Sequence, residues 1–130
     1  MWCVLDASAG AELVAAGSAH RIAAALSPYR EIFAPAHFDV ECASTVRRYW
    51  LRGLLDRAEM DAAIRAIPRL PVTRVPIPAL LPRAAELASN VTVQDALYLV
   101  LAELLPADML TLDRRLLGVP DPRCRIVLLD

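Results

Sequence analysis

The sequence contains no lysine, since all fourteen of its lysine-plus-arginine residues are arginine. This absence excludes sites that depend on a lysine, such as the phosphate-binding loop of nucleotide hydrolases and Schiff-base enzymes. Cysteine is also scarce, and the three thiols (Cys3, Cys42 and Cys124) form no Cys-x-x-Cys pair. We therefore expect no zinc site and no disulfide framework, and we expect the thiols to be reduced and mostly buried.

Long hydrophobic runs are absent as well. The longest clean apolar run, residues 96–102, is far shorter than the roughly 20 residues that cross a bilayer. No basic residue occurs among the first ten, and Asp6 interrupts the apolar stretch that a signal peptide would need. We therefore expect a cytoplasmic protein with no membrane association, and the length of 130 residues fits one domain over residues 1–130.

Charge of either sign is nearly balanced, whereas apolar residues are in excess. The net charge of −1 argues against a broadly basic nucleic-acid-binding surface. The apolar fraction of 57% exceeds the roughly 45–50% that is usual for soluble domains. Because large exposed apolar patches are rare on monomers, we expect a partner to cover part of this surface.

Short apolar segments alternate with stretches of helical periodicity along the chain. This alternation predicts an α/β fold with a central parallel sheet of four or five strands flanked by helices. The strands are expected at residues 1–5, 31–34, 72–75, 108–112 and 126–129. The helical segments are expected at residues 7–16, 19–26, 37–52, 80–88, 92–104 and 113–117, with a further helix that Asp56 opens and Pro68 closes.

Four acidic residues stand out by their position. Asp6 and Asp113 directly follow predicted strands, whose carboxyl ends line the ligand crevice of an open parallel sheet. Glu41 borders the apolar stripe of its helix, and Asp95 lies in the first turn of a helix beside apolar residues. Each acid also has a purely structural interpretation as a helix cap, a dipole partner or an ordinary flanking residue.

Taken together, the four acids can converge on one crevice. Convergent carboxylates repel one another, and a bound cation would relieve that repulsion. A ligand set made only of oxygen selects Mg²⁺ or Mn²⁺ over zinc or copper. Without these four carboxylates the rest of the chain would carry a net charge of +3, so the overall charge does not exclude a nuclease.

The chain resembles the VapC-type PIN domains in four segments that occur in the family's order and span nearly its whole length. These segments are V-L-D-A-S-A (residues 4–9), F-D-V-E-C-A-S-T-V-R-R (38–48), T-V-Q-D-A-L-Y-L-V-L-A-E (92–103) and L-T-L-D-R-R-L (110–116). The third and fourth are the more specific, whereas a lone D-A-S or a lone glutamate would be a weak signal.

The resemblance implies an RNA endonuclease of a toxin–antitoxin system that depends on Mg²⁺, with Mn²⁺ as a substitute. It also implies a cognate antitoxin protein and, often, a homodimer. The family's acidic positions correspond to Asp6, Glu41, Asp95 and Asp113. Its hydroxyl residues near the metal pocket correspond to Ser8 and Thr111.

Two arginine pairs lie close in sequence to the acids. They are Arg47 with Arg48, and Arg114 with Arg115. Guanidinium groups suit phosphate binding beside a metal, but solvated helix faces explain the pairs equally well.

Other polar and aromatic residues give weaker signals. We expect His20 and His37 to be structural or surface residues, because no nucleophile motif accompanies them. We expect Tyr98 to serve packing.

Two functions other than RNA cleavage fit part of this pattern. A PIN-like module that binds a protein partner, with weak or absent hydrolysis, is disfavoured because all four acids are present. A phosphoacceptor receiver domain also clusters acids on a parallel sheet. The missing lysine and the missing acidic pair after the first strand argue against it.

Overall fold

A computed structural model describes residues 1–15 and 17–130 of the chain. The strands are β1 (Trp2–Leu5), β2 (Glu31–Pro35), β3 (Thr73–Val75), β4 (Asp108–Thr111) and β5 (Ile126–Leu128). The α-helices are α1 (Ala7–Ala15), α2 (Ala19–Leu26), α3 (Phe38–Leu51), α4 (Arg57–Ala66), α5 (Leu81–Glu86) and α6 (Val93–Leu104). Short 3₁₀ helices cover Ile67–Arg69, Pro78–Leu80 and Arg114–Gly118.

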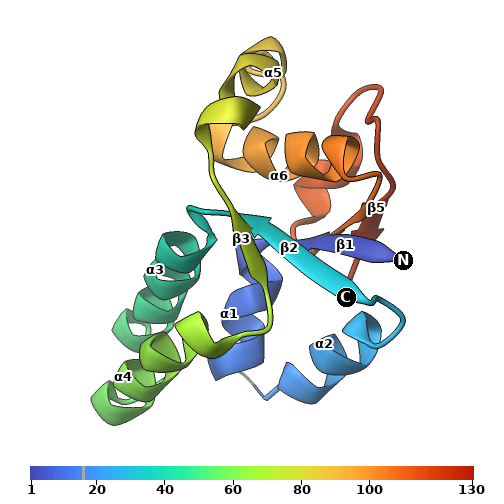
Figure 1. Cartoon of the computed structure of the whole chain (residues 1–130). Coiled ribbons are helices and arrows are strands. Elements are labelled where there is room, and N and C mark those ends of the chain that lie inside the picture. Colours follow the sequence, from blue (N-terminus) through green and yellow to red (C-terminus); the bar gives the residue numbers. More distant parts are fainter. Residues whose placement is uncertain (16) are drawn as a thin grey trace.

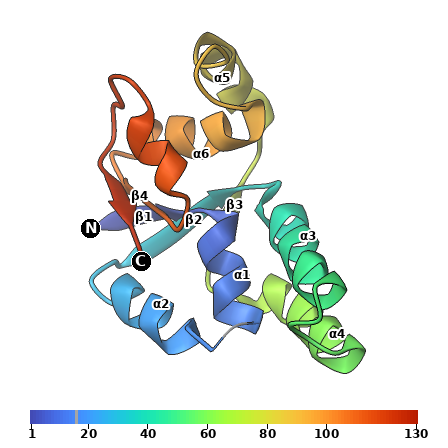
Figure 2. The ribbon, with the colours of Figure 1, turned by 180° about the vertical axis from the view of Figure 1, so that it is seen from behind.

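The five strands form one sheet in the order β3-β2-β1-β4-β5, and every neighbouring pair is parallel. Helix α6 covers one face of this sheet and α5 packs on α6, whereas α1 to α4 lie on the other side (Figures 1 and 2). The predicted α/β class with a parallel sheet is therefore confirmed, with five strands. None of the helices in the described part of the chain is long and apolar enough to cross a membrane.

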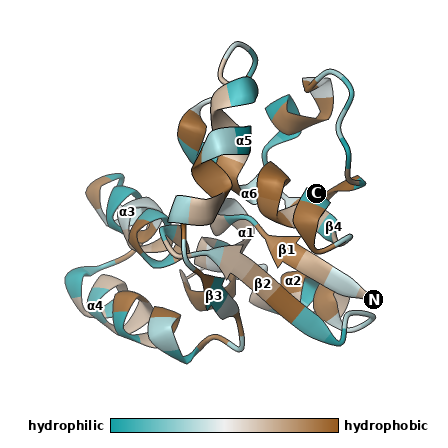
Figure 3. Ribbon diagram, turned by 45° about the horizontal axis from the view of Figure 1, so that its top comes forward, coloured by the Kyte–Doolittle hydropathy of each residue, from teal (hydrophilic) through white to brown (hydrophobic). Residues whose placement is uncertain are grey.

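The sheet is held between two apolar layers. The hydrophobic segments of β1, β2 and α6 gather at the centre of the molecule (Figure 3). Helix α6 is the most deeply buried helix, because every residue from Ala96 to Ala102 is buried. It lies against β1, β2 and β4, and its buried residues belong to the same apolar core as theirs, so apolar packing fixes the position of α6 over the sheet.

The local signals in the sequence mark the helix ends well. Asp56 caps α4 with a complete capping box, and Thr92 caps α6 through its side chain. Gly53 adopts a φ of 78° after α3, the left-handed conformation that favours glycine beyond a helix end. These three predictions are confirmed, and Ala16, the last residue of the predicted helix 7–16, lies outside the described residues.

The predicted helix 80–88 is wrong in its extent. A 3₁₀ turn at Pro78–Leu80 precedes α5, which ends at Glu86 and continues as turns. Pro82 is accommodated because it lies in the first turn of α5, where its missing N–H has no partner in any case. The predicted helical turn at 113–117 is a 3₁₀ helix that begins one residue later.

The strand order places a topological switch point between β1 and β4, because the chain runs outward in opposite directions from these two strands. In open parallel sheets the crevice beyond the carboxyl ends at this point is where ligands bind. Helix α3 is brought to the crevice by a close approach to α1. A Cβ atom on Gly10 would lie 2.7 Å from both Cys42 Sγ and Phe38 Cζ, so a glycine is needed there.

Candidate active site

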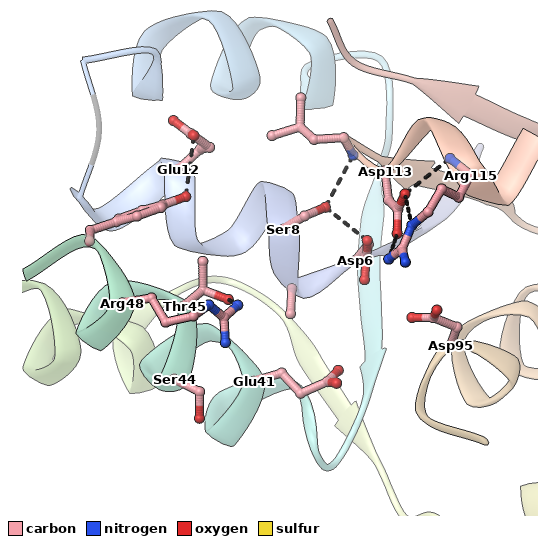
Figure 4. A pocket seen from close by; sticks show the side chains of 13 residues that line it. Asp6, Ser8, Glu12, Glu41, Ser44, Thr45, Arg48, Asp95, Asp113 and Arg115 are labelled. Atoms are coloured by element: carbon pink, nitrogen blue, oxygen red, sulfur yellow. Dashed lines mark hydrogen bonds and ion pairs between the residues drawn. The ribbon is translucent and has the colours of Figure 1, made fainter. Parts of the chain in front are cut away.

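A pocket of about 470 Å³ opens beyond the carboxyl ends of β1 and β4. All four acids singled out in the sequence line it: Asp6 after β1, Glu41 on α3, Asp95 on α6 and Asp113 after β4. Asp95 and Glu41 point toward Asp6 from opposite sides (Figure 4). The remaining lining residues are Ala7, Ser8, Glu12, Ser44, Thr45, Arg48, Tyr49, Leu112 and Arg115.

Asp6 forms the buried floor of the pocket, with only 6% of its surface exposed. Its Oδ2 accepts hydrogen bonds from the hydroxyls of Ser8 (2.8 Å) and Thr111 (2.7 Å). Burial raises the pKa of Asp6, and the nearby negative charges of Asp95 and Glu41 raise it further, against the opposing effect of the two hydroxyls. The two hydroxyl residues thus orient this carboxylate.

Asp95 lies in the first turn of α6, where Thr92 holds the backbone. The Asp95 amide donates to Thr92 Oγ1 at 3.2 Å, which leaves the carboxylate free to face the pocket. Burial raises the pKa of Asp95, and the charge of Asp113 acts in the same direction. The Thr92 hydroxyl and the positive charge of Arg115 oppose this rise in the pKa of Asp95 without cancelling it.

Asp113 differs from the other acids because a guanidinium already neutralises it. Arg115 donates from Nε to Oδ1 (3.0 Å) and from a terminal nitrogen to Oδ2 (2.7 Å), and its backbone amide also donates to Oδ1. These hydrogen bonds from Arg115 lower the pKa of Asp113. Asp113 therefore caps the 3₁₀ helix at 114–118 while it lines the pocket.

Glu41 lies against two aromatic side chains, Tyr98 and His37, for which only a packing or structural role was predicted. The Tyr98 hydroxyl donates to Glu41 Oε1 at 2.8 Å, and His37 Nε2 lies 3.2 Å from the same oxygen. Tyr98 is fully buried, so the packing role predicted for it is confirmed but incomplete. The available signal was spacing, because Tyr98 lies one helical turn after Asp95 and faces the same side.

The four arginines predicted near the acids separate into two kinds. Arg48 and Arg115 line the pocket, whereas Arg47 and Arg114 are absent from its lining within the described part of the chain. Arg48 donates to Thr45 Oγ1 at 2.9 Å. Arg114 instead forms an ion pair with Asp130.

The donor set of this pocket fits a hard divalent cation, because it consists of carboxylate and hydroxyl oxygens. As the side chains stand, no three acidic, histidine or cysteine groups among the described residues are close enough to hold one ion. Arg115 engages both carboxylate oxygens of Asp113, so Asp113 would have to exchange this partner in order to bind an ion. Asp6, Glu41, Asp95 and Asp113 are the residues that would hold the ion.

Comparisons with known proteins agree with this architecture. The sequence model of the PIN domain family matches residues 3–121. Ribonuclease VapC12 of Mycobacterium tuberculosis is 38% identical over 113 residues, which are 87% of this chain and 88% of that protein. Ribonuclease VapC3 of the same organism is 39% identical over 114 residues, 87% of this chain and 83% of that protein.

Solved structures show the same fold at low sequence identity. VapBC2 from Rickettsia felis, bound to a DNA fragment from its promoter, superposes with a TM-score of 0.70 at 14% identity over the whole of both chains. PAE2754 from Pyrobaculum aerophilum gives 0.69 at 21% identity over 97% of this chain and 83% of that one. With a matching family model over most of its length and similar relatives across it, the chain belongs to the PIN domain family.

Proposed function

We propose that this protein is a metal-dependent endoribonuclease of the VapC type, the toxin of a toxin–antitoxin pair. The observation that supports this most directly is the convergence of four carboxylates, from four separate segments, on one pocket. The VapC ribonucleases that this chain resembles support RNA as the substrate. The absence of lysine and of a nucleophile motif leaves hydrolysis by an activated water as the chemistry that these residues can perform.

In this proposal Asp6 and Asp95 are the principal ligands of Mg²⁺, or of Mn²⁺ as its substitute. Asp113 is a further ligand, and Glu41 either binds the ion or orients the attacking water. A bound divalent ion would polarise the phosphodiester and lower the pKa of the attacking water, whose proton a carboxylate of the site would take. The protein supplies orientation: Ser8 and Thr111 fix Asp6, and the buried floor limits the access of bulk water to it.

The two pocket arginines fit contacts with the RNA backbone. Arg48 lies on α3 beside Ser44 and Thr45, and Arg115 lies beyond β4 at the acid cluster. A guanidinium can bind a phosphate through two parallel hydrogen bonds. We propose that these two arginines bind phosphates of the substrate, and that Arg47 and Arg114 contribute only general positive charge.

Partners are proposed from the apolar surface. Large hydrophobic side chains are exposed at several positions, among them Leu51 and Leu54 at the end of α3 and Leu104 at the end of α6. Covering such residues by a second copy and by an antitoxin would remove apolar area from water. We propose that residues 1–130 form a single domain and that the protein is a homodimer. We also propose that it binds a cognate antitoxin and acts in the cytoplasm.

The test is cleavage of single-stranded RNA by the purified protein. We expect Mg²⁺ or Mn²⁺ to support cleavage and EDTA to abolish it. The Asp95→Asn variant, prepared in parallel, should be inactive and controls for contaminating nucleases. Cleavage that survives both EDTA and this substitution would refute the proposal. A folded protein that binds its partner but cleaves no RNA would indicate the binding module instead.

A further inference from the structure

The His37 imidazole connects the two helices that bear Glu41 and Asp95. It lies at the N-cap of α3, one turn before Glu41, and its Nε2 is 3.2 Å from Glu41 Oε1. The same Nε2 is 3.1 Å from the carbonyl oxygen of Gln94, the residue before Asp95 on α6. The ring packs against Tyr98, with centroids 4.9 Å apart. One side chain therefore contacts both acid-bearing helices.

The contacts assign the hydrogen on this ring. Nε2 forms its hydrogen bond with the carbonyl oxygen of Gln94, which can only accept, so Nε2 carries the hydrogen; the Glu41 carboxylate oxygen lies within ion-pair distance of the same nitrogen. The other ring nitrogen, Nδ1, is buried and has no hydrogen-bond partner among the described residues. The ring is thus oriented by Nε2 and by its contact with Tyr98, while Nδ1 contributes no hydrogen bond.

This arrangement is not the one that fold stability alone would favour. A buried nitrogen without a partner costs free energy, and an apolar ring at this site would avoid that cost. The Gln94 carbonyl would not be left unpaired, because it lies in the first turn of α6 and can accept from the backbone amide four residues on. Glu41 would keep its hydrogen bond from Tyr98. The Nε2 donor is therefore dispensable for the fold.

We propose that His37 is a positioning residue for the acid cluster: through Nε2 it sets the place of the Glu41 carboxylate relative to the first turn of α6 and hence to Asp95. The inference rests on the proposed metal-dependent function and assigns to it a residue that does not itself bind the ion. The Tyr98 hydroxyl donates to Oε1 of Glu41, His37 Nε2 lies beside the same oxygen, and Oε2 is left for the ion or for water. Groups that orient metal ligands in this way usually affect metal affinity strongly.

The test compares three variants of the full-length protein. His37→Phe keeps a flat ring but removes Nε2, and His37→Gln restores an amide donor of similar reach. His20→Gln is the matched control, because His20 is the other histidine of the chain and lies exposed on α2. Mn²⁺ affinity without RNA, measured by electron paramagnetic resonance, is the main readout. Cleavage kinetics and thermal melts in EDTA accompany it.

We expect His37→Phe to weaken Mn²⁺ binding about ten-fold and to lower kcat by a similar factor, with KM for RNA unchanged. His37→Gln should recover most of both losses, and His20→Gln should match the parent. The melting temperature of His37→Phe in EDTA should stay at or above that of the parent, since no acceptor is left unpaired.

Parental Mn²⁺ affinity and kcat in His37→Phe would overturn the inference, and the proposed nuclease would then stand without it. A lowered melting temperature with unchanged Mn²⁺ affinity would assign His37 a structural role only. A parent protein that binds no Mn²⁺ and cleaves no RNA would refute the proposed function itself.

Discussion

The pKa values of acidic residues are shifted in opposite directions at the two ends of the parallel sheet. At the amino end, Asp108 begins β4 and accepts hydrogen bonds from the Arg125 guanidinium and from the Tyr29 hydroxyl. The hydrogen bonds from Arg125 contribute most to lowering the pKa of Asp108. At the carboxyl end, burial raises the pKa values of Asp6 and Asp95, and neighbouring carboxylates add to the effect.

This difference shows how a functional site is distinguished from a structural contact. The presence of an acid is not enough; what matters is whether a cationic side chain of the protein neutralises it. Asp108 is a partner in an ion pair that joins β4 to the segment before β5. Asp6 and Asp95 lack a cationic side-chain partner among the described residues, and a cation from solution is the natural complement. Asp113 is intermediate, because the mostly exposed Arg115 neutralises it from the rim of the pocket.

The largest expected difference between the two ends of the sheet is in RNA cleavage. We expect Asp6→Asn to lower RNA cleavage at least about 100-fold, the scale on which essential acid–base or metal-binding groups act. Asp108→Asn should cleave at a rate close to that of the parent, because its contacts lie at the opposite end of the sheet. Initial rates on single-stranded RNA with saturating Mg²⁺ would measure both. Equal losses in the two variants would contradict the functional distinction between the two ends.

Replacing an acid by asparagine should change the stability of the metal-free protein in opposite directions at the two ends of the sheet. Asp95→Asn removes a carboxylate whose ionised form is disfavoured, so we expect it to raise the melting temperature in EDTA. A gain of about 1 kcal/mol in the free energy of unfolding corresponds to roughly 4 °C for a domain of this size. Asp108→Asn should lower the melting temperature by a similar amount, because Arg125 and Tyr29 lose their charged partner.

Both effects should depend on pH in a way that the pKa directions fix. The folded-state pKa of Asp95 is raised, so its carboxyl favours the fold at low pH and loses that contribution as pH rises through the raised pKa. The advantage of Asp95→Asn should therefore shrink on acidification. The pKa of Asp108 is lowered, so the stabilisation it gives persists until pH falls through that lowered value. Melts in EDTA from pH 7 to pH 4 should show the Asp95 trend and an unchanged contribution from Asp108, because the lowered pKa of Asp108 lies below this window. A lower melting temperature of Asp95→Asn at pH 7 would contradict the repulsive site.

Much of this architecture could be predicted from local patterns. The sequence predicted parallel strands but not their order in the sheet. The positions of Asp6 and Asp113 directly after strands were nevertheless enough to predict that both lie at the same edge of the sheet. The capping box at Asp56 and the glycine after α3 fixed helix ends, because those contacts lie within one turn of the chain.

What could not be predicted depends on contacts between distant segments. The hydrogen bond from Tyr98 to Glu41 spans 57 residues, and so does the contact of His37 with Gln94. The Gly10 contact that brings α3 to the pocket depends on packing that no periodicity reports. For Arg47 and Arg48 helical spacing does separate the two, because Arg48 lies seven residues, or two turns, after Glu41 on the same face of α3 and Arg47 is rotated from it by about 100°.

The arginine pairs allow the comparison to be sharpened for RNA binding. We expect Arg48→Ala to weaken RNA binding several-fold and to reduce the slope of log affinity against log salt by about 0.7, the value for one phosphate contact on a single strand. Arg47→Ala should have a smaller effect, since Arg47 lies outside the pocket lining in the described structure. Fluorescence anisotropy with the inactive Asp6→Asn background at several salt concentrations measures this. Identical slopes for the two variants would assign both arginines to general charge alone.

The smallest expected effect concerns Asp113, which lines the pocket but is already neutralised by an arginine of the protein. Arg115 engages both of its carboxylate oxygens, so a divalent ion that uses Asp113 as a ligand must displace this guanidinium. The Arg115 side chain is 85% exposed, and exposed pairs of this kind contribute less than about 1 kcal/mol. We therefore expect Arg115→Ala to raise Mn²⁺ affinity by only about three-fold.

Arg114→Ala is the control for the local backbone, and Arg48→Ala is the control for the loss of positive charge from the pocket. An increase confined to Arg115→Ala would mean that Asp113 exchanges one cationic partner for another when metal binds. An equal increase in Arg48→Ala would reduce the effect to general electrostatics, and no increase would exclude Asp113 from the ligands and group it with Asp108 as an acid compensated by the protein itself.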